Sequence, residues 1–482
     1  MSSLHCENIS YTPATDASPV FSGFSLTLDT REITVMTGDS GTGKTTLGLL
    51  LAGGIVPQNG KIFLNGQLLD NAQLKPGFLD QNPENQIFGT TVERDIAYGL
   101  ENQGIPREHM QSKIEIALDI FDLASIRKQP VDALSGGEKQ RTALAGLFVM
   151  EHPYFILDEP TSFLDYPSQK ILSRMLRRLR NEGKGLLWIT QYPEESVLGQ
   201  RVIELGDNDI LQDRKSKSYP IDEGLYKFSI PDNCKEAGEP LISAEGLSFQ
   251  YPQWENTKSF RLEIQKFSLK SGERQGWFGY SGSGKSTFAK LLTGILKPSD
   301  GQLSSVLSPG ELVYVPQFAE RMLYSGTLSQ TVELFTRHDN FDRQKYRIRL
   351  EHYFTLMGIS PEEPFRRPVW SFSGGEQRRI VLAVACALNP AVLILDEPTI
   401  GISPADRKKL VRVFQSEDVS ALICISHEYQ LLKRVTHHGF FFNYGKVHGP
   451  DTWANLEEYF HSCDPEIIYE KPLEIPIGSL PV

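Results

Sequence analysis

Two glycine-rich octapeptides in this sequence carry the residue types that bind phosphate groups. They run from Gly38 to Thr45 and from Gly279 to Ser286, and both follow the pattern G-x-x-x-x-G-K-[ST], known as Walker A. Their glycines let the backbone wrap closely around an anion, so that successive N–H groups point at phosphate oxygens. The lysine would neutralise the β- and γ-phosphates, and the final hydroxyl would hold Mg²⁺. The predicted nucleotide contacts are Gly38, Asp39, Ser40, Gly41, Thr42, Gly43, Lys44, Thr45 and Thr46 in the first copy, and Gly279, Tyr280, Ser281, Gly282, Ser283, Gly284, Lys285, Ser286 and Thr287 in the second.

The residues around each octapeptide predict a strand before it and a helix after it. Residues 32–36 and 275–278 have the composition of buried strands, and residues 46–52 and 288–292 begin apolar helices. A helix that starts at the loop adds the partial positive charge of its N-terminus to the site. Two copies in this context argue against a chance glycine-rich loop.

Paired carboxylates follow an apolar run in each half of the chain. Asp158-Glu159 and Asp396-Glu397 each come after four apolar residues, which predicts a position at the carboxyl end of a buried strand. Open α/β sheets bind their ligands at that end. We expect the aspartates to complete a Mg²⁺ shell and the glutamates to polarise a water for attack on the γ-phosphate. The alternative is a strand-end pair that caps a helix.

These landmarks recur at nearly constant spacing, which indicates a duplication of whole domains. The two Walker lysines are 241 residues apart. A four-residue S-G-G-E element, at 135–138 and 373–376, and the Asp-Glu pair both recur after 238 residues. The stretch between the halves carries many Asp, Lys, Ser, Gly and Pro residues, as linkers do. We predict domains at residues 1–210 and 241–464, a linker at 211–240 and a proline-rich tail at 465–482.

Alternating strand and helix patterns predict an α/β fold, with two tandem P-loop domains that each have a mainly parallel sheet. A largely helical stretch separates the Walker A loop from the S-G-G-E element and is expected to form a helical subdomain. Within it, residues 112–123 place Ile114, Ala117, Leu118 and Phe121 on one helical face.

Composition limits the classes of function. The chain has 482 residues, too many for one core, and a net charge of −11, which argues against binding of duplex nucleic acid. Its five cysteines form no C-x-x-C pair, so no metal cluster or disulfide framework is expected. There is no signal-peptide pattern and no apolar run long enough to span a membrane. We expect a soluble, cytoplasmic protein whose membrane association comes through a partner.

Both halves resemble the ATP-binding cassette ATPases over nearly the whole chain. The runs at 134–141 (LSGGEKQR) and 372–379 (FSGGEQRR) are similar to that family's signature element, which is far more specific than Walker A. The resemblance implies ATP and Mg²⁺ as cofactors, and two domains that pair within the chain around the nucleotide. The signature residues would reach the γ-phosphate held by the opposite domain: Ser135, Gly136, Gly137, Ser373, Gly374 and Gly375.

Other residues match the family's pattern position by position. Tyr11 and Tyr251 lie where an aromatic ring stacks on adenine, although both could be core tyrosines. Gln81 and Gln317 resemble the glutamine that contacts Mg²⁺ and senses the transport partner. Asp165 matches the family's aspartate in the loop after the strand-end Asp-Glu pair, and His427 matches the switch histidine that bonds the γ-phosphate.

Two positions depart from the family's pattern. Gln191 stands where the first half should have the switch histidine, and Ser403 where the second should have the loop aspartate. The resemblance implies that both departures fall in one composite site. Site one would comprise Lys44, Thr45, Glu159 and Gln191 with Ser373 and Ser403; site two would comprise Lys285, Ser286, Glu397 and His427 with Ser135 and Asp165. We expect site two to hydrolyse ATP and site one mainly to hold it; the alternative is neutral drift.

The run at 81–92, which includes N-P-E-N-Q, is similar to the ATPases of energy-coupling factor transporters. That resemblance implies an importer of a vitamin or metal ion, at the cytoplasmic side of the membrane, with integral membrane scaffold and substrate-binding subunits. Candidate contacts to the scaffold, which could equally pack the helical subdomain, are Ile87, Phe88, Met322, Leu323 and Tyr324. The alternatives are a tandem ATPase of a sugar importer and a soluble, translation-associated protein; the chain's acidity and short linker disfavour the latter.

Overall fold

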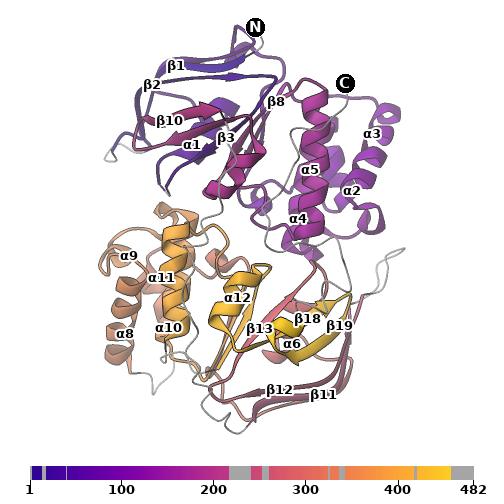
Figure 1. Ribbon diagram of the computed structural model, residues 1–482, viewed down its shortest axis with the longest axis vertical. Coiled ribbons are helices and arrows are strands. Elements are labelled where there is room, and N and C mark those ends of the chain that lie inside the picture. Colours follow the sequence, from indigo (N-terminus) through magenta and orange to yellow (C-terminus); the bar gives the residue numbers. More distant parts are fainter. Residues whose placement is uncertain are drawn as a thin grey trace. The chain divides into compact units, whose positions relative to one another are not determined.

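The computed structural model describes residues 3–13, 18–39, 41–215, 240–251, 260–323, 326–335, 342–416 and 421–456. These residues form two compact units, one within residues 3–215 and the other within residues 240–456 (Figure 1). Among the helices of the described ranges, none is both long enough and apolar enough to cross a membrane.

A six-stranded, mainly parallel sheet forms the centre of the first unit, as predicted. Only its edge pair, β9 and β10, runs antiparallel. In spatial order the strands are β10 (Ile210–Lys215), β9 (Arg201–Leu205), β3 (Ile33–Thr37), β8 (Gly185–Ile189), β7 (Tyr154–Asp158) and β6 (Gly77–Leu79). This order places β3, which leads into the first Walker A loop, directly beside β8, and β8 beside β7, which ends at Asp158.

A second, antiparallel sheet of four strands was not part of the sequence prediction. Its order is β2 (Phe21–Asp29), β1 (Ser3–Tyr11), β4 (Asn59–Leu64) and β5 (Gln67–Leu68). Buried residues of β2 alternate with exposed ones over most of its length, as expected for a strand with one face on a core. This sheet covers helix α1 (Lys44–Ala52), because the apolar residues of α1, β1, β2 and β4 belong to one hydrophobic core.

The parallel strands are buried on both faces, and their side chains alternate between two cores. Leu186 and Trp188 of β8 face the core shared with the helical subdomain, whereas Leu187 and Ile189 face the core shared with α1. The other helices pack against the first of these cores (Figure 1). They are α2 (Val92–Asn102), α3 (Arg107–Ile120), α4 (Gly136–Val149) and α5 (Tyr166–Asn181).

The second unit repeats this plan with its strands joined into one nine-stranded sheet. A single parallel bridge between Glu263 and Lys446 links the antiparallel part to the rest. The order is β14 (Asp300–Ser305), β11 (Pro240–Gln250), β12 (Arg261–Lys270), β19 (Lys446–Asp451), β18 (His438–Asn443), β13 (Arg274–Gly279), β17 (Ala421–Ile425), β16 (Val392–Asp396) and β15 (Leu312–Val315). Its helices are α6 (Lys285–Leu292), α7 (Leu328–Phe335), α8 (Arg343–Leu356), α9 (Glu363–Arg366), α10 (Gly374–Ala387), α11 (Pro404–Gln415) and α12 (Tyr429–Val435).

Two boundaries differ from the sequence prediction. The linker is expected from residue 211, whereas β10 continues to Lys215 and pairs with β9, so the first sheet includes these residues. The helix expected at residues 112–123 is α3, which begins at Arg107 and ends at Ile120; Ile114, Ala117, Leu118 and Phe121 are all buried. The linker between β10 and β11 and the tail at 465–482 lie outside the described residues.

A substitution of the buried Trp277 of β13 would test the core of the second unit. Its ring is fully buried and stacks on Phe288 of α6, with ring centroids 4.9 Å apart. We expect Trp277→Ala to lower the free energy of unfolding by about 3–5 kcal/mol, because it opens a large cavity. Urea unfolding followed by circular dichroism measures this. The control, Trp370→Ala, removes a ring that is 72% exposed and should have little effect; equal losses would contradict the assignment of the core.

Candidate nucleotide-binding sites

Each Walker A loop leads from a central parallel strand into a helix and depends on glycine at its last turn. Gly43 has φ of +90°, and a Cβ there would lie 2.6 Å from a side-chain methyl of Val20. Gly284 has φ of +107°, and its Cβ would lie 2.9 Å from the side chain of Leu262. Glycine suits both positions because it adopts a positive φ without strain and has no Cβ to clash with the neighbouring side chain. Ser40 lies outside the described residues.

The loop lysines are buried and bind the carbonyls of their own loops. Lys44 Nζ donates to the carbonyls of Gly38 (2.8 Å) and Asp39 (2.6 Å). Lys285 makes the equivalent bonds to the first two residues of its own loop, at 2.7 and 2.8 Å. Burial lowers the pKa of Lys44, while the charges of Glu159 and Asp158 oppose that shift. The lysines are thus held against the loops, where the sequence places the phosphates.

The strand-end aspartates contact the loop hydroxyls, as a shared metal site requires. The Thr45 hydroxyl donates to Asp158 Oδ2 at 2.6 Å. Burial and the charge of Glu159 raise the pKa of Asp158 to about 7. Burial also raises the pKa of Asp396, and hydrogen bonds from the hydroxyls of Ser286 and Tyr314 oppose that shift. A buried carboxylate beside a hydroxyl is a donor set of hard oxygens, so these residues fit Mg²⁺.

Both glutamates follow their aspartates in a strained backbone conformation. Glu159 has φ of +45° and Glu397 has φ of +50°, a region that non-glycine residues rarely adopt. The N–H of each donates at 2.9 Å to the last carbonyl of the neighbouring strand, at Ile189 and Ile425. Such strain persists where the surroundings enforce it, and it occurs often at functional sites.

In the first domain, three side chains donate hydrogen bonds to one oxygen of the Glu159 carboxylate, and two of them, Gln81 and Gln191, were predicted site residues. Glu159 Oε2 accepts hydrogen bonds from Gln81 Nε2 (3.1 Å), the Ser162 hydroxyl (3.1 Å) and Gln191 Nε2 (3.2 Å). The structure therefore brings Gln81 and Gln191 together at Glu159. These bonds occupy the lone pairs of Oε2, one of the two oxygens that a general base would offer to a water.

In the second domain, the equivalent carboxylate has different neighbours. Glu397 Oε2 accepts from the Ser426 hydroxyl at 3.1 Å, and Oε1 accepts from the His427 backbone N–H at 2.9 Å. The His427 ring lies close by, with Nε2 3.5 Å from Oε1. Burial and the adjacent Asp396 raise the pKa of Glu397 to about 8. Gln317 follows β15 and is half-buried.

The signature elements form the N-termini of α4 and α10 through identical capping boxes. The Ser135 hydroxyl and N–H both donate to Glu138 at 2.8 Å, and Ser373 makes the same two bonds to Glu376. The following glycines, Gly136, Gly137, Gly374 and Gly375, are the first residues of the two helices. Each signature element thus begins a helix.

The departure at Ser403 keeps a structural role of the residue that it replaces. Asp165 is the N-cap of α5 and accepts a bond from the Ser168 N–H at 3.1 Å. Ser403 is the N-cap of α11 and accepts a bond from the Asp406 N–H at 3.2 Å. Serine and aspartate cap helices about equally well, so the exchange preserves the helix start and removes a negative charge.

The two tyrosines proposed for adenine differ in their surroundings. Tyr11 ends β1 and packs, half-buried, against the core of the antiparallel sheet, as a core tyrosine would. Tyr251 is 41% exposed, and its hydroxyl lies 3.2 Å from the Thr287 hydroxyl at the start of α6. Tyr251 thus borders the second Walker A loop with part of its ring accessible.

Two buried cations join the signature helices to the loops that carry Gln81 and Gln317, here called the glutamine loops. Neither cation was predicted from the sequence. Arg378 of α10 donates to the carbonyls of Gln317 (2.6 Å) and Glu397 (3.1 Å) and to the Glu320 carboxylate (3.2 Å). In the first domain, Lys139 of α4 forms an ion pair with Glu84. The sequence shows both cations close behind the S-G-G-E element, Lys139 directly after it and Arg378 one residue later, but it does not show that they are buried.

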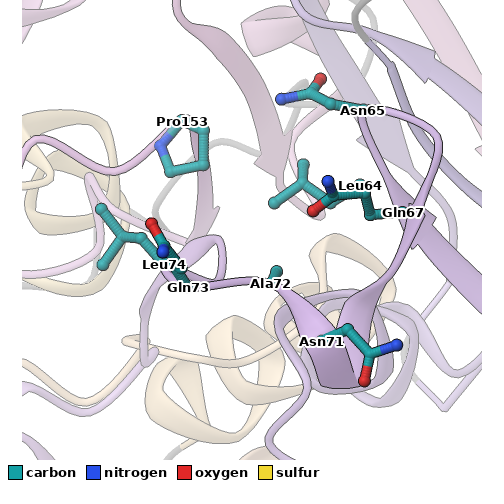
Figure 2. A pocket seen from close by; sticks show the side chains of 8 residues that line it. All are labelled: Leu64, Asn65, Gln67, Asn71, Ala72, Gln73, Leu74 and Pro153. Carbon is teal, nitrogen blue, oxygen red and sulfur yellow. The ribbon is translucent and has the colours of Figure 1, made fainter.

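A pocket elsewhere in the first domain does not suit a triphosphate. Figure 2 shows that its lining carries amide and apolar side chains and no charged group. The lining residues are Leu64, Asn65, Gln67, Asn71, Ala72, Gln73, Leu74 and Pro153, none of which belongs to the Walker A loop.

Comparison with known proteins matches both halves of the chain to one family profile. The profile of the family described as "ABC transporter" matches residues 21–162 and 262–400. A Bacillus subtilis (strain 168) protein named "Putative HMP/thiamine import ATP-binding protein YkoD" is 28% identical, and the match covers 89% of this chain and 88% of that protein. The "Putative ABC transporter ATP-binding protein BL0043" of Bifidobacterium longum (strain NCC 2705) is 27% identical over 84% of this chain, which spans 60% of that protein's length.

Solved structures with two such domains share the fold. A chain of "Model of ribosome-bound archaeal Pelota and ABCE1" matches with a TM-score of 0.68 and 21% sequence identity, over 95% of this chain and 80% of that chain. At this identity the likeness concerns the fold alone.

The contacts of Arg378 generate a prediction for the second domain. Arg378→Met would leave the two carbonyls and the Glu320 carboxylate without their cation, so we expect a loss of about 3 kcal/mol in the free energy of unfolding. Urea unfolding followed by tryptophan fluorescence measures it. Arg366→Met serves as the control, since Arg366 is exposed and its ion pair with Glu362 is worth at most about 1 kcal/mol. Similar losses in both variants would refute a structural role for Arg378.

Proposed function

Because this chain belongs to the ABC transporter family and carries two ATPase domains in one polypeptide, we propose that it powers an importer of energy-coupling factor type. It would drive uptake of a vitamin or a metal ion through integral membrane subunits, from the cytoplasmic side of the membrane. The observation that carries the importer proposal is an exposed aromatic pair beside the first glutamine loop. The Bacillus subtilis relative, whose name specifies HMP/thiamine import, supports the same class.

The residues of the second domain can perform ATP hydrolysis. Lys285 and the loop N–H groups would bind the phosphates, while Ser286, Gln317 and Asp396 would hold Mg²⁺. Bound Mg²⁺ would neutralise charge on the phosphate oxygens. Glu397 would orient the attacking water and accept its proton, since the carboxylate is fixed at the strand end. His427 lies against this carboxylate and would contact the γ-phosphate.

We also propose that the two domains pair head to tail within the chain and form two unequal sites. Site one would use Lys44, Thr45, Glu159 and Gln191 with Ser373 and Ser403; site two would use Lys285, Ser286, Glu397 and His427 with Ser135 and Asp165. The three donors on Glu159 Oε2 support the inequality, because they compete with a water for that oxygen. Thr45, Gln81 and Asp158 would hold Mg²⁺ in site one, which would retain ATP with little hydrolysis.

The inequality predicts different effects for two matched substitutions. Glu397→Gln should lower the steady-state ATPase rate at least about 100-fold, because it removes the general base of site two. Glu159→Gln should change the rate less than about two-fold. The measurement is phosphate release by the purified full chain, with binding of a fluorescent ATP analogue to show that both variants remain folded. Equal losses of activity would contradict the unequal sites.

One ring of the exposed aromatic pair, Phe88, follows a loop that side-chain hydrogen bonds hold in place. Phe88 is 67% exposed and stacks on Tyr98 of α2, with ring centroids 5.5 Å apart. The Gln86 side chain donates to the Phe78 carbonyl at 2.6 Å and accepts from the Asp80 N–H at 2.8 Å. Exposed aromatic pairs on an ordered loop are typical of protein interfaces. This surface would receive a membrane subunit.

In the second half, Met322 and Leu323 are half-buried, and Tyr324 lies outside the described residues. Ile87 is also half-buried, which suits its alternative role of packing the helical subdomain. Phe88 is therefore the strongest of the five candidate contacts.

Two other functions remain candidates. A sugar importer would use the same ATPase chemistry with other membrane subunits. A translation-associated protein shares the fold, but the similarity to the ribosome-bound structure is 21% in identity, and a net charge of −11 disfavours contact with RNA. Capture of bound partners distinguishes transport from translation. Either kind of importer requires integral membrane subunits, whereas a translation-associated protein requires ribosomes.

Removal of the exposed ring should weaken the contact with the membrane subunits. In cells that supply the natural partners, we expect Phe88→Ser to lower the amount of membrane protein that co-purifies with the tagged chain about ten-fold, with ATP binding retained. Leu211→Ser, which alters a 63% exposed residue on β10, is the control and should have no effect. Co-sedimentation of the unaltered chain with ribosomes, without membrane partners, would overturn the proposal.

A further inference from the structure

We propose that Tyr314 is a positioning residue that makes the metal site of the second domain tighter than that of the first. The inference rests on the proposed function, in which Asp158 and Asp396 bind Mg²⁺. Its basis is one hydroxyl group that the second domain has and the first domain lacks.

The sheet places the Tyr314 ring within reach of Asp396. Tyr314 lies on β15, next to the parallel strand β16, and pairs in register with Ile394, two residues before Asp396. Its hydroxyl donates to Asp396 Oδ2 at 3.0 Å. The Ser286 hydroxyl also bonds this carboxylate, so two donors from different elements hold it.

The first domain has the same register without the hydroxyl. Phe78 of β6 pairs with Ile156 of β7, again two residues before the aspartate, Asp158. The loop hydroxyl is retained, since Thr45 donates to Asp158. The two domains therefore differ at this position by one oxygen atom on an otherwise equivalent ring.

A second donor should improve metal binding by fixing the orientation of the carboxylate. Mg²⁺ demands near-octahedral geometry, so an aspartate that is already oriented loses less freedom when it binds. A tyrosine on a buried sheet is a rigid donor, because its position depends on only two side-chain torsions. The hydrogen bond also withdraws charge from Oδ2, which acts against binding. Partners of metal ligands generally change affinity by about 10–100-fold in the favourable direction, so the orienting effect should prevail.

The role predicts a change in metal affinity with little change in nucleotide binding. Mn²⁺ is titrated into the full-length chain at a saturating concentration of a non-hydrolysable ATP analogue, and free Mn²⁺ is measured by electron paramagnetic resonance. The unaltered chain should show a tight and a weak class of site. Tyr314→Phe should raise the Kd of the tight class about ten-fold. An unchanged Kd would overturn the proposal.

Two controls separate this inference from the proposed function. Phe78→Tyr, the reciprocal change, should leave the tight class unchanged. Binding of the same nucleotide in EDTA should be equal for the unaltered chain and for Tyr314→Phe; a parallel loss there would show that Tyr314 only supports the fold and would overturn the positioning role. Failure of the unaltered chain to bind Mn²⁺ with nucleotide would instead contradict the proposed function.

Discussion

Each domain must keep two adjacent carboxylates buried at the end of a central strand, and the surrounding contacts follow from that constraint. Asp158 and Glu159 are 2% and 7% exposed, and Asp396 and Glu397 are similarly buried. Buried carboxylates are costly unless they accept hydrogen bonds or face a cation. The positive φ of each glutamate turns the chain sharply after the aspartate. The aspartate then meets the Walker A hydroxyl, and the glutamate meets side chains from neighbouring loops.

The two domains satisfy the same constraint with different donors. Glu159 is held by the amides of Gln81 and Gln191 and by a serine hydroxyl, whereas Glu397 has a backbone N–H, a serine hydroxyl and the His427 ring beside it. An amide N–H can only donate a hydrogen bond to a carboxylate, whereas an imidazole ring can also gain or lose a proton. The duplication thus preserves the fold while the chemical environment of the two glutamates diverges.

In both domains a buried cation connects the signature helix to the loop that carries the predicted metal-binding glutamine. Arg378 donates hydrogen bonds to the backbone carbonyls of both Gln317 and Glu397. A shift of the loop that carries Gln317 would therefore disturb the contacts at the end of the strand. In the first domain, the glutamine loop carries Glu84, which pairs with Lys139, and the exposed Phe88 follows a few residues later. Short chains of buried polar contacts of this kind can couple two sites if they have alternative arrangements.

The sequence alone determined the family resemblance, the duplication, the parallel α/β core and the local form of the phosphate loops, because these depend on short motifs and on periodicity. The strand end at Asp158 followed from the four apolar residues before it. The antiparallel sheet, the extension of β10 to Lys215 and the buried cation Arg378 became evident only in the tertiary structure. Strand pairing and burial depend on residues far apart in the chain, so no local pattern specifies them. The difference between Phe78 and Tyr314 is visible in the sequence, yet only the register of β15 on β16 shows that the hydroxyl reaches Asp396.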